Sequence, residues 1–486
     1  MLNVEREVSI KFFSVSKVSD LVSPDMKRIF LFLLFNMVLF SLHAQDLQAL
    51  QQAAIQNNRS LQSSRIAVQM AQEDRKQAFT NYFPTIQAAG GVFQGFHHLL
   101  QADINMPMLA MMGMPAISIS EIKKGALVNA TAVQPVFAGG QIVNGNRLAS
   151  LQEEIRQLQL RMSERDVTLQ VARLYWQTIA LQANIGTLDA ADRQLAEVHK
   201  FTSDYVAAGL ATRNDILRVE LKQQELASSR LQLQNGIALC KMTLAQLCGN
   251  GGATTVSPTG SATVPAVSPA GSATVPAVSP AGYIDSLISR IGTDTTQLAE
   301  VSTPLPSWDE SGVALRTEAL LSRKAIDAAD LQVKMERGKY MPTAAIGIAD
   351  MYYNMMAKNV NNGIVFATVS VPISAWWGGT YGIRKAKLAR QQAANDYADT
   401  VEKLRLDNQS AWNNLQESLS QISIAEKSIA SADENLRMSF DQYKAGTLPL
   451  IDLLDAQTLR QQAADRLIEA RANYQLRLAE YESKIQ

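Results

Sequence analysis

Two carboxylates stand close together near the C-terminal end of the sequence. In YKAGTLPLIDLLDAQ, residues 443–457, Asp452 and Asp455 lie three residues apart in an otherwise apolar stretch that follows Gly446. Residues three apart share one face of a helix, so both side chains would point the same way. Carboxylates that crowd into a narrow passage attract cations. The simpler interpretation is a pair of acids at a helix start, where the helix dipole favours negative charge.

The rest of the sequence offers no catalytic motif. Outside the apolar run near the N-terminus, the histidines are His97, His98 and His199, which lack metal-ligand spacing, and neither a G-x-S-x-G motif nor a phosphate-binding loop is present. The 45 basic residues balance 45 acidic ones, so no basic face is indicated for a nucleic acid. Cys240 and Cys248 suit neither a disulfide framework nor a zinc site and are expected to be buried apolar side chains. We expect no enzyme activity, no cofactor and no nucleic-acid partner.

A methionine-rich stretch leaves two interpretations open. The sequence LLQADINMPMLAMMGMPAISIS, residues 99–120, contains Met106, Met108, Met111, Met112 and Met114. Soft thioether sulfurs bind Cu(I), so this stretch could gather copper. A flexible apolar loop is the simpler interpretation, because methionine commonly fills irregular apolar gaps.

The chain is an internal duplication, because landmarks of the first half recur in the same order in the second half. Three landmarks recur 237 residues further on: Gly209 as Gly446, Asp215 as Asp452, and Pro135 as Pro372. A fourth pair, Pro84 in NYFPTIQ and Pro342 in KYMPTAA, lies 258 residues apart. The segments between landmarks therefore differ in length while their order is kept.

Each half contains one very long predicted helix. Residues 141–208 lack proline and repeat apolar side chains every three or four positions. In the second half, apolar residues recur between 397 and 436 at alternating intervals of four and three positions. Only Asn408 and Ser418 are polar among the residues at these intervals, and this pattern indicates a coiled-coil seam. A helix of about 65 residues would be roughly 100 Å long.

Shorter helices flank the long ones. They are predicted at about residues 46–82, 212–248, 310–340 and 450–484. Gly209 and Gly446 would form the turns between a long helix and a shorter one, because glycine is favoured just past a helix C-terminus.

The helical period fails between the prolines of each half. Pro84 and Pro135 bracket one such segment, and Pro342 and Pro372 bracket the other. Alternation of apolar and polar side chains predicts strands at about residues 85–97, 125–135, 343–353 and 363–372. Each strand has about the length that crosses a bilayer at a tilt. Four strands cannot close a barrel and open sheet edges are not tolerated in lipid, so several chains would have to share one barrel.

The N-terminal residues resemble a secretory signal. In MKRIFLFLLFNMVLFSLHAQ, residues 26–45, Lys27 and Arg28 precede an apolar run that ends near the small residue Ala44. We expect residues 1–44 to be an extension plus a signal peptide, with Met26 as the true start. A retained membrane anchor is the alternative, but the run is short for a membrane span.

A low-complexity segment separates the two halves. Residues 249–282 are rich in Pro, Ser, Thr, Val and Ala, and GSATVPAVSPA occurs there twice in tandem. This composition predicts a flexible, semi-extended spacer rather than a helix. The expected organisation is a first repeat at 45–248, a linker at 249–308 and a second repeat at 309–486.

These features together resemble the TolC family of outer membrane efflux proteins. The resemblance rests on the signal, the duplication, the paired prolines and the YKAG and IDLLDAQ motifs, and covers residues 46–486 apart from the linker and the methionine-rich stretch. It implies a mainly α chain with a small β part that forms a homotrimer. Three chains would supply a twelve-stranded β-barrel in the outer membrane and an α-barrel of long coiled-coil helices crossing the periplasm. The implied function is a passive duct of a tripartite efflux or type I secretion system, with a periplasmic adaptor and an inner-membrane pump as partners.

The resemblance also assigns the two aspartates. In the family, the turn between the long and short helices of the second half lies at the periplasmic tip, where two aspartates form constricting rings that face the lumen. Asp452 and Asp455 match those positions. Asp215 matches a first-half residue that supports the closed tip, and Tyr443 matches a tyrosine of the same closing network.

One departure concerns how the tip is closed. The best-known family members carry an arginine two residues after the turn glycine, where this chain has Leu448 followed by Pro449. The ion pair that locks the tip in those members would be missing here, or rebuilt through Arg213.

Two other functions remain open at this stage. A periplasmic coiled-coil adaptor or scaffold that never enters a membrane would also use long helices, and would be recovered as a soluble monomer. A duct directed at copper or silver would use the methionine-rich stretch, and deletion of residues 104–114 would then lower copper tolerance.

Overall fold

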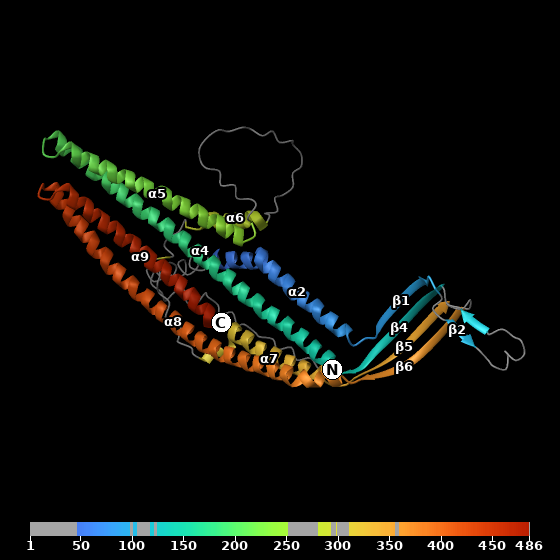
Figure 1. Cartoon of the computed structure of the whole chain (residues 1–486). Coiled ribbons are helices and arrows are strands. Elements are labelled where there is room, and N and C mark those ends of the chain that lie inside the picture. The colour runs from blue at the N-terminus through green and yellow to red at the C-terminus, as the bar shows by residue number, and fades with distance from the viewer. Residues whose placement is uncertain are drawn as a thin grey trace, which may run out of the picture. The chain divides into compact units, whose positions relative to one another are not determined.

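The computed structural model describes residues 46–97, 101–104, 117–120, 124–250, 280–292, 298, 311–354 and 359–485 (Figure 1). The predicted signal at 1–44, the five methionines of the methionine-rich stretch and residues 251–279 of the linker lie outside these ranges.

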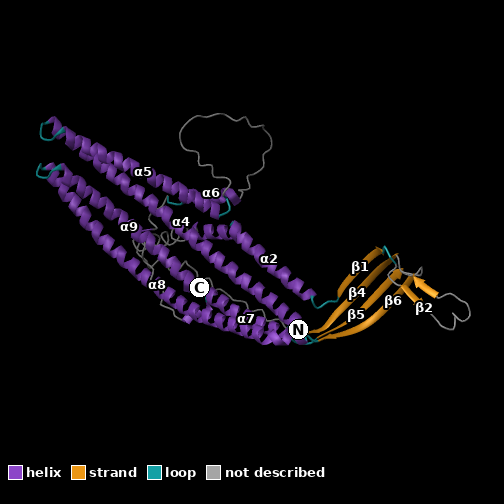
Figure 2. Cartoon of the chain, in the orientation of Figure 1, coloured by secondary structure: helices purple, strands orange, loops and turns teal. Residues whose placement is uncertain are grey.

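Most of the described chain is helical, and the strands form one small part of it (Figure 2). The two long helices are α4, Gln141–Ala207, and α8, Trp376–Lys444, of 67 and 69 residues. The shorter helices are α2 (Arg59–Thr80), α5 (Arg213–Leu247), α6 (Pro280–Arg290), α7 (Thr317–Gly338) and α9 (Leu450–Ile485). None of the helices in the described ranges is both long and apolar enough to cross a bilayer.

The single helix predicted at 46–82 is interrupted. Residues 46–57 are helical, Asn58 is not, and α2 starts at Arg59. The buried Asn58 side chain donates a hydrogen bond to the carbonyl oxygen of Leu247, at 3.1 Å. A Cβ on Gly249 would lie 2.6 Å from the Cβ of Asn57, so the chain passes very close to the end of α5 here. The break therefore depends on a tertiary contact that periodicity cannot report.

Part of the predicted spacer is also helical. Helix α6 starts at Pro280, inside the low-complexity segment, where proline is tolerated as a first helical residue. Its apolar side chains Ile284, Leu287 and Ile288 are buried. The Asn250 amide donates to the Asp285 carboxylate at 2.7 Å, which joins this helix to the end of α5.

The described chain divides into two compact units that cut across the two repeats. One unit takes residues up to 58, 167–304 and 417–476, and the other takes 59–166, 305–416 and 477–486. Each unit therefore contains segments of both the first and the second repeat.

The four long strands form one antiparallel sheet in the second unit. The strands are β1 (Thr85–Gln94), β4 (Lys124–Ala138), β5 (Thr343–Asn354) and β6 (Asn359–Ser370), in the order β1-β4-β5-β6. Pairing of β4 with β5 joins the first repeat to the second. A separate two-stranded ribbon, β2 (Gln101–Ile104) with β3 (Ile117–Ser120), lies in the stretch for which the sequence predicts only a loop.

Three of the four landmark prolines lie at strand ends. Pro84 and Pro342 directly precede β1 and β5, and Pro372 follows β6. Pro135, predicted to close its strand, lies inside β4 instead, beside a register shift between Pro135 and Phe137. A proline in a strand is tolerated at such a bulge, so the strand continues to Ala138.

The junction between strands and helices is tightly packed. Gly139 has φ +60°, and a Cβ there would collide with the backbone of Gly338. Glycine at both positions lets the start of α4 and the end of α7 approach each other closely.

Candidate functional site

Two equivalent turns end the long helices in the first unit. Gly209 and Gly446 have φ of +75° and +70°, and neither would meet a neighbour if it carried a Cβ. Glycine is therefore needed for its left-handed backbone rather than for space. Both turns have the same hydrogen bonds: Gly209 N to Val206 O, Leu210 N to Tyr205 O, Gly446 N to Tyr443 O and Thr447 N to Gln442 O. This Schellman motif satisfies carbonyl groups left over at each helix end.

Asp452 and Asp455 lie on the exposed side of the first turns of α9. The intervening Leu453 and the flanking Leu450 and Ala456 are buried. Within the described residues, neither carboxylate has a hydrogen-bond or ion-pair partner. The apolar side chains thus fix one face of α9 in the packed core while both acids remain available on the other.

Asp215 occupies the equivalent position in the first repeat but is engaged locally. Its Oδ2 accepts hydrogen bonds from the backbone N–H of Thr212 at 2.9 Å and from the Thr212 hydroxyl at 2.7 Å. These bonds, the backbone one first, hold the pKa of Asp215 below its ordinary value. This is a capping box at the start of α5. Arg213 beside it is exposed and makes no ion pair with any residue the structure describes.

Tyr443 is buried where α8 meets α4. Its hydroxyl lies 2.7 Å from Oγ1 of Thr202, and that oxygen in turn donates to the carbonyl of Val198 at 2.8 Å. Since the single proton of the Thr202 hydroxyl is used in that way, Tyr443 is the donor to Thr202. Burial raises the pKa of Tyr443, with the nearby Asp215 charge acting in the same direction.

Aromatic and cationic contacts surround this hydrogen bond. The Lys444 ammonium lies over the rings of Phe440 and Phe201, 4.1 and 5.0 Å from their centroids. The Tyr205 hydroxyl donates to the carbonyl oxygen of Lys444 at 2.7 Å. Leu448, which stands in place of the family's arginine, packs against the apolar cluster that contains Tyr443. The contact between the helix ends is therefore apolar, aromatic and hydrogen-bonded.

Sequence reasoning missed several of these partners. Thr202, Tyr205, Lys444 and the two phenylalanines were not singled out, although they stand beside the turn residues that were. The signal available was the spacing of Phe201 and Tyr205 by four residues, which places both on one helix face.

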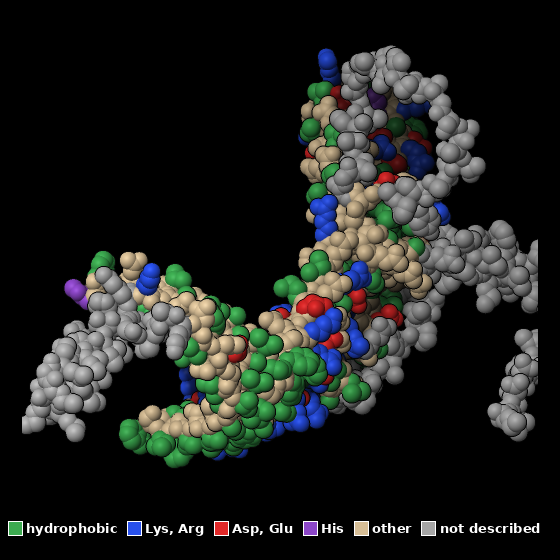
Figure 3. All heavy atoms as spheres, turned by 90° about the vertical axis from the view of Figure 1, so that its right-hand side faces the viewer, with side chains coloured by type: hydrophobic (Ala, Val, Ile, Leu, Met, Phe, Trp, Pro, Cys, Tyr) green, Lys and Arg blue, Asp and Glu red, His purple; other side chains and the backbone are tan. Residues whose placement is uncertain are grey.

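One face of the sheet, recognised from the pairing register because opposed residues share a face, carries many aliphatic side chains and is called the apolar face below. These side chains are Ile86, Ala88, Val92, Ala126, Val128, Ala130, Ala132, Ile346, Ile348, Val365, Ala367 and Val369. The same face also carries polar residues, most of them near the strand ends: Gln94, Lys124, Gln134, Asp350, Asn354, Asn359 and Asn361. Several members are almost fully exposed, with Val92 at 86% and Val365 at 81%. Hydrophobic side chains gather along the lower part of the strand region in Figure 3. The opposite face mixes apolar residues with Thr85, Gln87, Asn129, Thr131, Thr343 and Thr368.

Both edges of the sheet are unpaired in the described chain. β1 pairs only with β4, and β6 pairs only with β5. These edges are 10 and 12 residues long, so each leaves a row of backbone donors and acceptors without strand partners.

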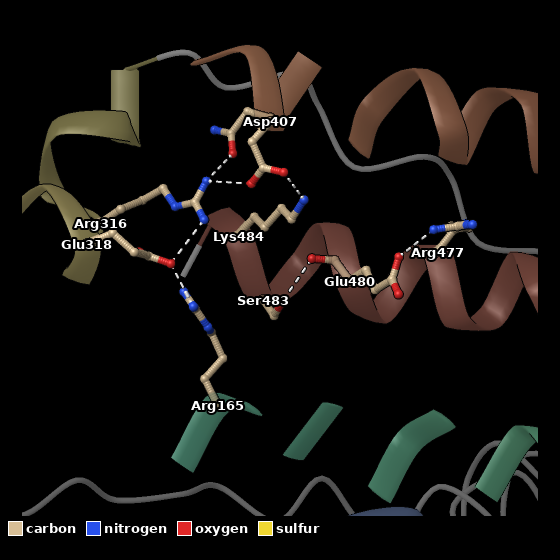
Figure 4. Close-up of polar contacts among 9 residues, drawn as sticks. Arg165, Arg316, Glu318, Asp407, Arg477, Glu480, Ser483 and Lys484 are labelled. Atoms are coloured by element: carbon tan, nitrogen blue, oxygen red, sulfur yellow. Dashed lines mark hydrogen bonds and ion pairs between the residues drawn. The ribbon is translucent and has the colours of Figure 1, made fainter. Parts of the chain in front are cut away.

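An ionic cluster around the buried Arg316 side chain joins four elements of the second unit (Figure 4). The Arg316 guanidinium donates to Asn408 at 2.8 Å and to the carboxylates of Asp407 and Glu318, each at 3.3 Å. Glu318 also accepts from Arg165 at 2.6 Å, and Asp407 accepts from Lys484 at 2.7 Å. Burial alone would raise the pKa of Glu318, but the bond from Arg165 and the charges of both arginines bring it below the ordinary value.

This cluster explains a polar residue in the predicted seam. Asn408 is only 3% exposed, and its side-chain oxygen accepts the shortest hydrogen bond from Arg316. The apolar alternation is interrupted there because a buried guanidinium needs an acceptor.

The described ranges contain no cluster of three or more His, Cys, Asp or Glu side chains that could hold a metal ion. The five methionines considered as copper ligands lie outside those ranges. Cys240 and Cys248 are buried, as expected, and burial raises the pKa of the Cys248 thiol to about 11.

The long helices, the paired turns and the four-stranded sheet define a member of a known class. The family model described as outer membrane efflux protein matches residues 50–250 and 318–480, which is more than half of the chain. The chain therefore belongs to the outer membrane efflux protein family. Outer membrane protein TolC of Escherichia coli (strain K12) is 27% identical over an alignment of 176 positions, which covers 32% of this chain and 34% of that protein. The chain thus matches about a third of the length of this curated relative.

Solved structures share the fold over most of both chains. A membrane protein from Pseudomonas aeruginosa superposes with a TM-score of 0.71 at 13% identity, over 91% of this chain and 92% of that one. The outer membrane protein VceC from Vibrio cholerae gives 0.66 at 16% identity, over 91% of this chain and 96% of that one. The fold class, the family and the outer-membrane location predicted from the sequence are confirmed. The family is one of efflux proteins and not of enzymes, in agreement with the sequence.

Proposed function

We propose that three copies of this chain enclose one passive duct that leads from the periplasm to the exterior. The duct would be the outer-membrane component of a tripartite efflux or type I secretion system. Its export energy would come from an inner-membrane pump, reached through a periplasmic adaptor that docks at the helix tip around residues 205–215 and 443–452.

The sheet carries this proposal. In the described residues, one chain supplies a sheet of four strands with an exposed apolar face and two unpaired edges. Lipid tolerates an apolar face but not an open edge, because unpaired backbone groups cannot reach water there. Pairing β6 of one copy with β1 of the next, three times over, satisfies both edges and gives a closed barrel of an even number of strands. A soluble scaffold would leave both the apolar face and the edges in water.

The proposed gate is formed by the aspartates of α9. In a threefold assembly, Asp452 and Asp455 would each form a ring of three carboxylates around the pore. Such rings attract cations and repel anions. Gly209, Gly446, Asp215 and Tyr443 would hold the helix tip that positions these rings, with residues 45–248 and 309–486 as the two repeats and 1–44 removed as a signal.

The gate is tested by removing its charge. Asp452→Ala combined with Asp455→Ala should raise single-channel conductance or weaken block by Mg²⁺ in planar bilayers. The matched control is Asp396→Ala with Asp399→Ala, another exposed pair of aspartates three residues apart on α8. Unaltered conductance and block in the first variant would remove the ring assignment, and a soluble monomer instead of detergent-stable trimers would favour the scaffold.

A further inference from the structure

We propose that Pro449 is a positioning residue that keeps the Asp452 carboxylate unengaged, so that it can act in the pore. The inference rests on the proposed function of the aspartate ring. It assigns a role to the residue that precedes α9 and explains why the two repeats use equivalent aspartates differently.

The two aspartates have the same place in their helices. Asp215 is the third residue of α5 and follows Thr212 by three positions, while Asp452 is the third residue of α9 and follows Pro449 by three. The backbone is alike at both sites: the Asp215 N–H donates to the Thr212 carbonyl at 3.0 Å, and the Asp452 N–H donates to the Pro449 carbonyl at 3.2 Å. The two helix starts therefore share this backbone hydrogen bond and differ in the residue that precedes the helix.

The chemical difference lies in the residue before the helix. Thr212 has a backbone N–H and a hydroxyl, and both donate to the Asp215 carboxylate. Proline has neither group. A carboxylate at Asp452 can therefore make no capping box, and it has no hydrogen-bond or ion-pair partner in the described part of the chain.

The equivalent aspartates therefore have different roles in the two repeats. In the first repeat the carboxylate is turned back onto its own helix start, where two donors compensate its charge. In the second repeat proline occupies the same position but offers no donor to the carboxylate. The Asp452 carboxylate is therefore not drawn back onto its helix start and is available to a cation in the passage.

The test replaces Pro449 with two residues of equal shape. Pro449→Thr restores both donors, whereas Pro449→Val restores only the backbone N–H and is otherwise isosteric with threonine. The concentration of Mg²⁺ that halves single-channel current should be about threefold to tenfold higher for Pro449→Thr than for Pro449→Val, since hydrogen bonds to a charged acceptor must be given up when the cation binds. Conductance without Mg²⁺ and trimer stability should be equal in the two variants, because both lose the proline.

One further variant separates this inference from the function on which it rests. Asp452→Asn with Asp455→Asn, in the same assay, should weaken the block strongly. If it does, but the threonine and valine variants have equal half-blocking concentrations, the role of Pro449 is wrong and the ring stands. If the double variant leaves the block unchanged, the ring itself is wrong.

Discussion

Tyr443 shows how a few side chains hold the helix ends together. It is 5% exposed, donates to Thr202 and lies within an apolar cluster that includes Leu448. Family resemblance assigns this tyrosine to the closing network of the tip, where the best-known members use an ion pair as the lock. The described contacts between α4 and α8 at this point are instead hydrogen bonds, aromatic rings and one cation over two rings. Such contacts are screened little by salt, unlike an exposed ion pair.

Removing this hydrogen bond should loosen the tip. Tyr443→Phe and Thr202→Val should each cost about 1 kcal/mol, and the double variant should cost less than the sum because both changes remove one shared bond. Hydrogen exchange of residues 201–207 and 440–446, followed by mass spectrometry, measures the effect. Strictly additive costs would show that the two hydroxyls are not coupled.

The capping aspartate gives a prediction with a defined pH dependence. Because bonds from Thr212 lower the pKa of Asp215 in the folded protein, its stabilising effect is present above the ordinary aspartate range and is lost as the pH falls through the lowered pKa. Thr212→Val should therefore weaken the first turn of α5 by about 0.5–1 kcal/mol at neutral pH, and by less at an acid pH below the lowered pKa of Asp215. Exchange rates of residues 213–217 at the two pH values check this. An equal effect at both would mean that the charge of Asp215 is not involved.

Among the elements, α8 carries the clearest sequence signal and also its most informative exception. Its seam residues Leu404, Ala411, Leu415, Ile422 and Leu436 are buried as the alternation of four and three predicts. Asn408 is buried as well, because its side chain accepts a hydrogen bond from Arg316, which belongs to another element. The sequence predicts the buried face of α8 because the same face of this helix is packed over many turns. It does not predict why Asn408 is buried, because its partner Arg316 lies 92 residues away in the sequence.

Asn408 and Arg316 should therefore depend on each other. Asn408→Leu completes the apolar seam but removes an acceptor from a buried guanidinium, and should cost about 1–3 kcal/mol. Adding Arg316→Met should recover much of that loss, because an apolar pair of similar volume needs no hydrogen bonds. The thermal midpoint in detergent measures both, with the exposed Gln409→Leu as control. A stabilising Asn408→Leu would contradict this role for the cluster.

The other elements differ in how far the sequence determines them. Strand alternation and the turn glycines are local properties, and these features lie close to where the sequence predicts them. The break at Asn58, the continuation of β4 past Pro135 and the start of α6 at Pro280 each depend on a neighbouring segment. At the candidate site, the aspartates and Tyr443 could be named from sequence motifs. The partners of Tyr443 could be identified only once the packing of α4 against α8 was known.

The two faces of β6 should respond differently to the same charge. Ala367 lies on the apolar face opposite Ile346, and the next residue, Thr368, lies on the other face. Ala367→Arg should cost up to about 2–4 kcal/mol of membrane stability and reduce the amount of protein assembled in the outer membrane, whereas Thr368→Arg should assemble and shift ion selectivity toward anions. Membrane fractionation and the reversal potential of the duct check the two outcomes. Equal assembly of both variants would mean that the apolar face does not meet lipid.

For the whole molecule, the proposed assembly follows from groups that one chain leaves without partners. Among the described residues, the sheet has an exposed apolar face and edges at β1 and β6 that no strand pairs, and the start of α9 has exposed carboxylates beside a packed core. A closed ring of copies would pair the edges, and the same symmetry would repeat the carboxylates around one passage.

Electron cryomicroscopy of the protein extracted from outer membranes and placed in a lipid nanodisc tests this assembly most directly. The expected result is three copies around one pore, with β6 of each copy hydrogen-bonded to β1 of the next and Asp452 and Asp455 facing the passage. A different number of copies, or edges of β1 and β6 that remain apart in the lipid, would contradict it.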